Sequence, residues 1–218
     1  MALISARNLS LLVVAYDEAN ARQFDWSHVG AAETHLVINY RKIPLSTLGN
    51  YFLDHRRPEC DLFGIVHADT WIGPGCLDIL CKCASQGSVA GLVGFSLVQA
   101  EANKEHKGHV WSWINGRRFD LLDIKPCLVS TLDSASCFFA IASGLRFDEK
   151  TFDGFHCHVE DLCLQAQSRG MPVVVPQCSA SHTGNQKLQN WNDYLHQDRR
   201  RYTEKLAAKW PDVRFGTT

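Results

Sequence analysis

The sequence predicts a single α/β domain in which a mostly parallel sheet is flanked by helices. Two observations carry this prediction. Apolar runs rich in β-branched residues alternate along the chain with segments of helical periodicity. No internal repeat, low-complexity segment or linker divides the chain into two domains. Strands that alternate with helices are typical of a sheet with helices on both sides.

The first part of the chain contains four predicted strands and two predicted helices. The strands are apolar runs, and they are Leu9–Tyr16, His35–Tyr40, Asp61–Val66 and Ala90–Leu97. The first helix lies in Pro44–His55, where leucines and Phe52 recur on one face and a proline stands near the start. The second helix, Cys76–Ser85, follows a Gly-Pro-Gly turn.

The segment Gln99–Ser130 breaks this pattern, because it is polar, contains Trp111 and Trp113 and has no clear period. Two interpretations are equally good. A long irregular segment in a compact domain is often a functional loop or lid. The alternative is a surface excursion with a hairpin and two partly buried tryptophans.

Regular structure resumes after this segment. We expect a strand at Ser136–Ala142, a helix at Val159–Arg169 that ends at Gly170, and a short buried strand in "MPVVVP". An amphipathic helix should then end near Pro211. Its Arg199–Arg201 run fits a solvated face, and it could also neutralise a phosphate.

Composition excludes several classes of protein. The chain has 218 residues, 45% of them hydrophobic and 21% charged, as in ordinary soluble proteins. Its net charge of -1 argues against a general nucleic-acid binder. No apolar run reaches the roughly 20 residues of a membrane span, and the N-terminal run ends in Asp17 and Glu18 rather than in a cleavage site. We therefore expect a cytoplasmic protein.

The nine cysteines are expected to be reduced and mostly buried as small hydrophobic residues. Cys81 and Cys83 are too close for a usual zinc pair, and "HCHVEDLC" lacks the C-x-x-C spacing of a structural site. We therefore do not expect structural zinc.

Polar residues follow the predicted strands at the positions where ligands gather in open α/β sheets. Asp17 follows the first strand, and His67 and Asp69 follow the third. A carboxylate at Asp69 suits Mg²⁺ or Mn²⁺, which prefer oxygen ligands. His182, after the last predicted strand, could supply an imidazole to the same ion, although a histidine in a loop is more often solvated.

Five features follow one another in "TLDSASCFFAI" and "LRFDEKTFDGFHCHVEDLCLQAQSRGMPVVVPQCSASHTG": a small-residue strand, a Phe-Asp-Glu turn, an acidic helix start, a glycine-ended helix and a histidine after the next strand. In this order the segment Leu132–Gly184 resembles the C-terminal half of inverting family-two glycosyltransferases of the GT-A fold. It is most similar to the branch of the streptomycin-biosynthesis glycosyltransferase domain. "IVHADTW" looks like that branch's metal motif with histidine in place of the first aspartate, and "RRRYTEKLAAKW" looks like its tail.

The resemblance implies a GT-A-like, Rossmann-like fold in which residues 1–98 bind the nucleotide and residues 99–218 bind the acceptor and form the C-terminal helix. Asp69 and His182 would hold a Mn²⁺ or Mg²⁺ ion on the diphosphate of a nucleotide-sugar donor. A UDP-sugar is the donor that we expect before any other. The ion would stabilise the departing nucleoside diphosphate as a Lewis acid. The residues implied to contact the nucleotide are Ala15, Tyr16, Asp17, Glu18 and His67.

The inverting mechanism needs a carboxylate that deprotonates the acceptor hydroxyl. Glu160 and Asp161 are the candidates, because the position of the family's usual acid falls on Val159. The base could instead be Asp153 or His158, and Asp161 could be no more than a carboxylate favoured at a helix start.

The acceptor would be a saccharide or another hydroxyl compound. Aromatic and imidazole side chains could line its site, namely Trp111, Trp113, Phe155, His156 and His158. Core packing explains the same residues almost as well. Two rival functions stay open. One is a catalytically silent binding or scaffold protein on the same fold. The other is a sugar nucleotidyltransferase, which is disfavoured because "AYDEANARQFDW" contains no glycine.

Overall fold

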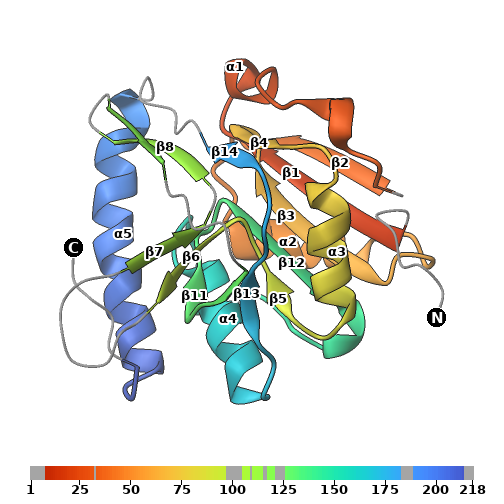
Figure 1. The fold of residues 1–218 in the computed structure, drawn as a ribbon. Helices are drawn as coiled ribbons and strands as arrows, with labels where there is room; N and C mark the ends of the chain where they lie inside the picture. The colour runs from red at the N-terminus through yellow and green to blue at the C-terminus, as the bar shows by residue number, and fades with distance from the viewer. Residues whose placement is uncertain are drawn as a thin grey trace.

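The computed structural model of the chain describes residues 8–31, 33–96, 105–108, 110–114, 117–120, 126–182 and 189–213. A central seven-stranded sheet is accompanied by two smaller sheets and by helices (Figure 1). The strands are β1 (Leu9–Ala15), β2 (Glu33–Ile38), β3 (Leu62–His67), β4 (Thr70–Ile72), β5 (Val89–Ala90), β6 (Val93–Ser96), β7 (Glu105–Gly108), β8 (Val110–Ile114), β9 (Arg117–Asp120), β10 (Cys127–Leu128), β11 (Thr131–Leu132), β12 (Ser136–Ala140), β13 (Val173–Val175) and β14 (Ala180–His182). The helices are α1 (Glu18–Ala21), α2 (Leu45–Asp54), α3 (Cys76–Ser85), α4 (His158–Ser168) and α5 (Gln189–Lys209), with short 3-10 helices η2 (Trp26–His28) and η3 (Ile141–Ser143).

The central sheet has the strand order β10-β13-β5-β12-β3-β1-β2. Five of its seven strands (β1, β2, β3, β5 and β13) run in one direction, and β10 and β12 run against them. The predicted mostly parallel α/β sheet is therefore confirmed. The sequence did not predict the direction of β12, because an apolar strand carries no sign of the way it runs.

Strand β1 is buried along its whole length, which is why its sequence is a continuous apolar run. Successive side chains of a strand point to opposite faces of the sheet. Leu11 and Val13 accordingly belong to the core that α3 covers, whereas Leu12 and Val14 belong to the core shared with α2 and α4. The helix α3 lies in front of the sheet in Figure 1.

The predicted strand Ala90–Leu97 is wrong as one element, because the chain changes sheets within it. β5 pairs with β12 and β13, whereas β6 pairs with β7 and β11. The change occurs at Gly91, where an added Cβ would lie 2.7 Å from the carbonyl oxygen of Ser136. A glycine inside a strand pattern often marks such a close backbone approach.

The segment Gln99–Ser130 is not irregular where the structure describes it. β8 and β9 form an antiparallel hairpin, with Trp111 opposite Asp120 and Trp113 opposite Arg118. The hairpin expected in this segment is therefore present, whereas the burial of the two tryptophans and a role as a functional loop stay predictions. β8 also pairs in parallel with β14, in the small sheet of order β4-β14-β8-β9.

Ion pairs fasten α5 to the segment that precedes and begins α4, and three of them come from two lysines. Lys205 lies 2.6 Å from Asp153, and Lys209 lies 2.7 Å from Asp148 and 2.8 Å from Asp161. These carboxylates are far from α5 in sequence, so the pairs join distant parts of the chain. α5 ends just before Pro211, as the sequence predicts.

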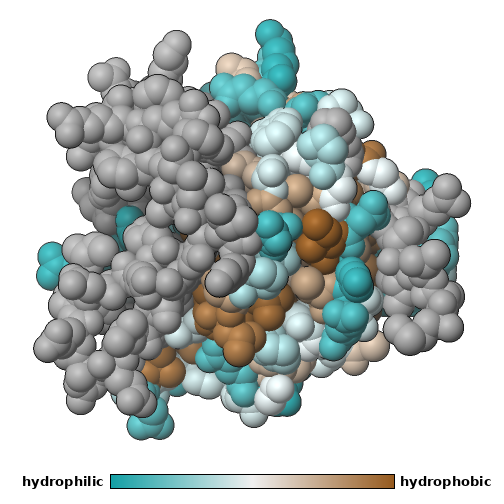
Figure 2. Space-filling model, viewed as in Figure 1, coloured by the Kyte–Doolittle hydropathy of each residue, from teal (hydrophilic) through white to brown (hydrophobic). Residues whose placement is uncertain are grey.

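The described surface is mixed in character. On the face shown in Figure 2, hydrophobic residues lie in separate groups among hydrophilic ones. Among the described residues, no helix is long and apolar enough to cross a membrane. All nine cysteines are free thiols in the structure, and seven of them are buried, which confirms the expectation that they are mostly buried.

A substitution at Gly64 probes the packing between β3 and β12. The cross-strand partner of Gly64 is Phe138, whose ring would lie 2.5 Å from an added Cβ. We expect Gly64→Ala to lower the free energy of unfolding by about 1–3 kcal/mol, because the ring has to move in a packed core. Urea unfolding measures this change.

Gly30→Ala is the matched control, because its added Cβ would meet no atom within 4 Å. Its effect should stay within about 0.5 kcal/mol. Equal stability of the two variants would contradict the packing described for β3 and β12.

Candidate functional site

Three strand ends meet at one edge of the central sheet. β1 and β3 end there, and the antiparallel β12 begins there. Backbone hydrogen bonds hold the three together: the His67 N–H donates to the Ala135 carbonyl at 3.0 Å, and the Ala68 N–H donates to the Val14 carbonyl at 2.8 Å. Residues that follow β1 and β3 therefore lie beside residues that precede β12.

Asp69 lies in the turn between β3 and β4, and its side chain is 5% exposed. β4 pairs with β14 so that Thr70, the next residue after Asp69, lies opposite His182. The structure thus brings the backbone positions of Asp69 and His182 together, as their predicted pairing on one ion requires. Coordination of a metal by these two residues stays a prediction.

Tyr16 follows β1 and reaches the same edge. Its ring meets the ring of His67 edge-on, with 5.8 Å between centroids and 72° between planes, and Phe155 lies 6.3 Å away. Burial raises the pKa of the Tyr16 phenol well above its ordinary value, and the negative charges of Asp69 and Asp133 raise it further. The phenol therefore stays protonated and can donate a hydrogen bond.

Asp133 also lies at this edge, although the sequence alone does not point to it. We expected acids directly after strands, because ligands gather at the carboxyl ends of parallel strands. β12 runs antiparallel to β3, so the residues before β12, and not those after it, lie at this edge. The acid of "TLDSAS" ahead of a small-residue strand could have served as a signal only if the direction of β12 were known.

The resemblance implies further nucleotide contacts in the segment that ends β1 and follows it. In the structure these residues mostly hold the local backbone in place. Ala15 is fully buried, and its carbonyl accepts from the Asn39 N–H at 2.8 Å. Asp17 caps α1, since its Oδ1 accepts from the Asn20 N–H at 2.7 Å. Glu18 is exposed and accepts from the Tyr40 hydroxyl at 3.0 Å. Nucleotide contacts by these residues stay a prediction.

The turn into α4 is tightly fixed. Cys157, the residue before the helix, has a left-handed φ of 64°. The Phe155 N–H donates to the Asp198 carboxylate on α5 at 3.1 Å, and a Cβ added at Gly154 would strike the Tyr202 ring at 2.5 Å. Close contact with α5 therefore sets the position of the residues that begin α4.

The structure uses Asp161 as an anchor. Its side chain is 0% exposed, and its Oδ1 accepts from the Trp210 indole N–H at 2.7 Å and from Lys209. Its Oδ2 accepts from Gln165 at 2.8 Å. These contacts favour the structural interpretation of this carboxylate that the sequence left open.

The remaining candidate bases differ in their surroundings. Asp153 is held by Lys205 and by the Tyr202 hydroxyl, which lower its pKa to about 2. His158 is fully buried, and burial lowers its pKa to about 3. Glu160 is half-buried, and its charge reinforces the rise in pKa that burial gives the Cys137 thiol on β12. A role as base for any of these residues stays a prediction.

The residues expected to line an acceptor site divide into two groups. Phe155 and His158 are 2% and 0% exposed, so they pack in the interior, whereas His156 is half-buried and reaches the surface. Trp111 and Trp113 lie on β8, which runs beside β14, with Trp111 aligned to Ser181. The acceptor role of these residues stays a prediction.

The described residues do not form a complete metal site by themselves. Among the described residues, no group of three or more histidine, cysteine, aspartate or glutamate side chains could hold a metal ion. Asp69 nevertheless brings a buried carboxylate to this edge, and the pairing of β4 with β14 brings the backbone of His182 beside it. Mg²⁺ and related ions are often held by only one or two carboxylates, with substrate phosphates and waters as the other ligands. The residues present fit an ion that binds together with a diphosphate.

Comparison with known proteins gives a likeness in structure only. No family model and no curated protein matches the chain. A crystal structure of GalNAc-T7 with UDP, GalNAc and Mn²⁺ matches with a TM-score of 0.53 at 7% identity, over 82% of this chain and 44% of that chain. A structure of A197 from STIV matches with a TM-score of 0.47 at 11% identity, over 79% of this chain and 84% of that chain.

This chain thus spans less than half the length of the GalNAc-T7 chain that it matches. At so low an identity the likeness shows the fold alone. The chain has a mixed α/β fold with a seven-stranded central sheet, structurally similar to GT-A glycosyltransferases. The predicted GT-A-like fold is confirmed, and the streptomycin-type branch stays a prediction.

The ion pairs on α5 predict a pH dependence. Burial alone would raise the pKa of Asp148, but hydrogen bonds from Lys209 and Thr151 lower it to about 2. The pKa of Asp148 is lower in the folded protein than its unfolded value of about 4. The ion pair of Asp148 therefore stabilises the folded state above about pH 4, and this stabilisation is lost as the pH falls towards about 2. We expect Lys209→Met to lower the free energy of unfolding by about 1–3 kcal/mol near neutral pH.

The difference between wild type and Lys209→Met should shrink as the pH falls from about 4 towards 2, because Asp148 then becomes protonated in both proteins. Urea unfolding at several pH values measures it. Lys150→Met, at an exposed lysine in the same region, is the control and should change little. A difference that does not vary with pH would contradict the ion-pair account.

Proposed function

We propose that the chain is a metal-dependent glycosyltransferase that moves a sugar from a nucleotide-sugar to an acceptor hydroxyl. The favoured donor is a UDP-sugar, and the transfer inverts the anomeric centre. One observation carries the proposal: on a GT-A-like sheet, the turn with Asp69 lies beside the strand that carries His182. The similar GalNAc-T7 structure contains UDP, GalNAc and Mn²⁺, which supports this class of donor and ion.

In this proposal each residue has one role. Asp69 and His182 hold Mn²⁺ or Mg²⁺, and the ion supplies Lewis-acid stabilisation of the departing diphosphate. Tyr16, a protonated donor at the same edge, hydrogen-bonds the diphosphate or the ribose. His67 packs on Tyr16 and orients it. His156, Trp111 and Trp113 belong to the proposed acceptor side.

Glu160 acts as the general base. Its carboxylate takes the proton of the acceptor hydroxyl while that oxygen attacks the anomeric carbon. A new carbon–oxygen bond forms as the bond to the diphosphate breaks, and its electron pair leaves with the nucleoside diphosphate. Attack from the side opposite the leaving group inverts the anomeric centre.

A silent binding protein on the same fold is the second candidate. It is favoured by the buried, apolar Val159 at the position of the family's usual acid, and by the use of Asp161 as an anchor. Such a protein would bind a nucleotide-sugar in the presence of metal without breaking it down.

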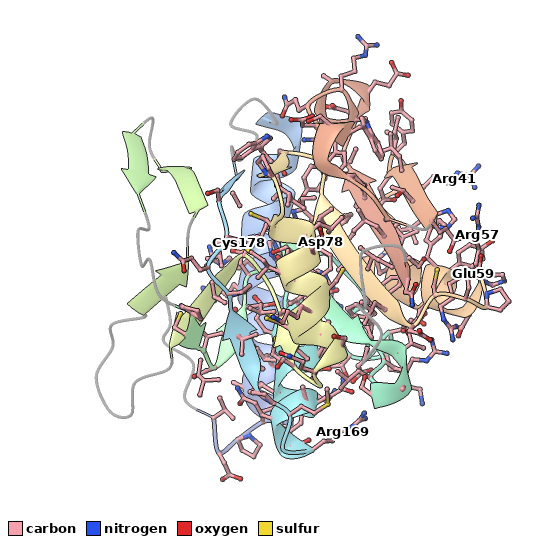
Figure 3. The ribbon with its side chains drawn as sticks, turned by 45° about the vertical axis from the view of Figure 1, so that its right-hand side comes forward. Arg41, Arg57, Glu59, Asp78, Arg169 and Cys178 are labelled. Atoms are coloured by element: carbon pink, nitrogen blue, oxygen red, sulfur yellow. The ribbon has the colours of Figure 1, made fainter. Side chains whose placement is uncertain are left out.

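Release of UDP from UDP-sugars in the presence of Mn²⁺ tests the proposal, with water as the acceptor. We expect release from at least one UDP-sugar, and a decrease of about 100-fold or more in Asp69→Asn, because the variant loses the charge that holds the ion. Asp78→Asn is the control, since this residue lies on the exposed side of α3 (Figure 3) and should leave the rate unchanged. Tight UDP binding without any release would favour the silent binding protein.

A second prediction separates the base from the anchor. Glu160→Gln should lower the rate of UDP release by about 100-fold with little change in the free energy of unfolding, because it removes a proton acceptor. Asp161→Asn should instead lower the free energy of unfolding by about 1–3 kcal/mol, because it weakens the contacts with Lys209 and Trp210. The reverse pattern would assign the base to Asp161. Urea unfolding and the release assay are carried out on both variants.

A further inference from the structure

Asp133 and Asp69 are brought to one sheet edge from distant parts of the sequence. β12 is antiparallel to β3, with Ser136 opposite Val66, and the last backbone hydrogen bond between them joins Ala135 to His67. Beyond that bond the chain reaches Asp133 on one side and Asp69 on the other. Both residues therefore lie just beyond the last hydrogen bond of this strand pair, and the negative charges of both carboxylates raise the pKa of the Tyr16 phenol.

The position of Asp133 is well fixed. Its N–H donates to the Val93 carbonyl at 2.9 Å, and its Oδ1 accepts from the Ala135 N–H at 2.7 Å. Leu132, the residue before it, is fully buried. The side chain of Asp133 is half-buried, and none of the described residues donates to its Oδ2. A preorganised carboxylate oxygen is thus available to accept hydrogen bonds.

The strand order indicates which part of a ligand reaches Asp133. β3 lies between β1 and β12 in the sheet. A nucleotide-sugar is linear, with the diphosphate between the nucleoside and the sugar. If the diphosphate lies at Asp69 after β3 and the nucleoside lies at Tyr16 after β1, the sugar extends towards β12.

We propose that Asp133 binds hydroxyl groups of the donor sugar and so contributes to the choice of that sugar. This inference rests on the proposed function. A carboxylate accepts hydrogen bonds from hydroxyl groups, and such charge-assisted bonds are stronger than neutral ones. The ligand class is a nucleotide-linked pyranose with free ring hydroxyls. Asp69 serves the ion, and Asp133 serves the sugar.

Calorimetric titration of UDP and of UDP-sugars, both with Mn²⁺, tests this assignment. Asp133→Asn should bind UDP with the wild-type affinity within about 2-fold, and should bind the preferred UDP-sugar about 10-fold more weakly. Asp61→Asn is the matched control, because Asp61 lies just before β3, at the opposite end of the strand from Asp69. Both affinities should stay unchanged in this control.

Each other outcome has a distinct meaning. If Asp133→Asn loses UDP binding while remaining folded, the residue serves the ion or the diphosphate and the inference is overturned. If neither affinity changes, Asp133 does not touch the sugar. If wild type binds no UDP with Mn²⁺, the proposed function fails and the inference falls with it.

A second inference rests on separate contacts, at the start of α3. Beyond the pairing of β4 with β14, the Gly73 N–H donates to the Ser179 carbonyl at 2.8 Å. This contact places Cys76, the first residue of α3, against Cys178, which precedes β14. The Cys76 Sγ accepts from the Ser179 N–H at 3.0 Å, and the Cys178 Sγ lies 3.8 Å from the Cys76 carbonyl oxygen. Figure 3 shows Cys178 beside α3.

These contacts distinguish Cys76 from the other thiols. Hydrogen bonds from the Cys178 thiol and from backbone N–H groups lower the pKa of the Cys76 thiol, whereas the same contact raises the pKa of Cys178. Burial instead raises the pKa of Cys81 to about 12, and it also raises those of Cys60 and Cys83. The thiolate is the nucleophilic form of cysteine, so Cys76 is the most reactive thiol of this group at neutral pH.

We infer that Cys76 and Cys178 form a reversible disulfide when a hydroperoxide is present. The Cys76 thiolate attacks a peroxide oxygen to give a sulfenic acid and hydroxide. The Cys178 sulfur then displaces the hydroxyl group, which leaves as water with the Cys178 proton. In total two thiols lose two electrons and hydrogen peroxide is reduced to two waters. The bond would tie α3 to the strand that carries His182.

Treatment with hydrogen peroxide, alkylation and peptide mass spectrometry test this pair. We expect a Cys76–Cys178 linked peptide and a rise in Tm that dithiothreitol reverses, both absent in Cys178→Ser and retained in Cys83→Ser. Cys178→Ser should instead accumulate the sulfenic acid of Cys76. Another linkage, or unmodified Cys76 at a peroxide dose that oxidises free cysteine in the same solution, would overturn the inference.

Discussion

The hydrogen bond between the His67 N–H and the Ala135 carbonyl fixes the geometry on which the site depends. It closes the antiparallel pair of β3 and β12 at the point where one strand ends and the other begins. Because of it, a turn with Asp69 and a turn with Asp133 lie at one edge beside Tyr16. The same edge receives β14 through its pairing with β4, which places His182 opposite Thr70. Four segments far apart in the sequence thus contribute to one site.

The second constraint is the attachment of α5. Ion pairs from two lysines hold three aspartates before and within α4, and contacts with Asp198 and Tyr202 hold the turn at Gly154. These contacts give Asp153 and Asp161 a structural role, and the identity of the base stays a proposal. The C-terminal helix therefore stabilises the side of the site on which we expect the acceptor.

The sequence predicts the helices and the buried strands of the central sheet well, because their apolar patterns are strong. α3 coincides with its predicted range, and α2 differs from its own by one residue at each end. Strand direction and partners could not be predicted, since they depend on contacts between distant segments. For this reason the sequence does not place Asp133 at this edge. It also predicts one strand at Ala90–Leu97, where the chain in fact changes sheets at Gly91. The position of Asp69 at this edge could be predicted because it comes two residues after the end of a parallel strand. The anchoring role of Asp161 could not be chosen over catalysis, because Lys209 and Trp210 lie far along the chain.

The central claim is that the edge at Asp69 binds an ion and a diphosphate together. Isothermal titration calorimetry with Mn²⁺ alone, UDP alone and UDP in the presence of Mn²⁺ tests it most directly. Since one or two protein carboxylates leave most ligand positions to phosphate and water, we expect little heat from Mn²⁺ alone. UDP should bind at least about 10-fold more tightly with Mn²⁺ than without it, and Asp69→Asn should abolish this gain. Binding of UDP that is equally strong with and without the ion, or unaffected by Asp69→Asn, would contradict the account.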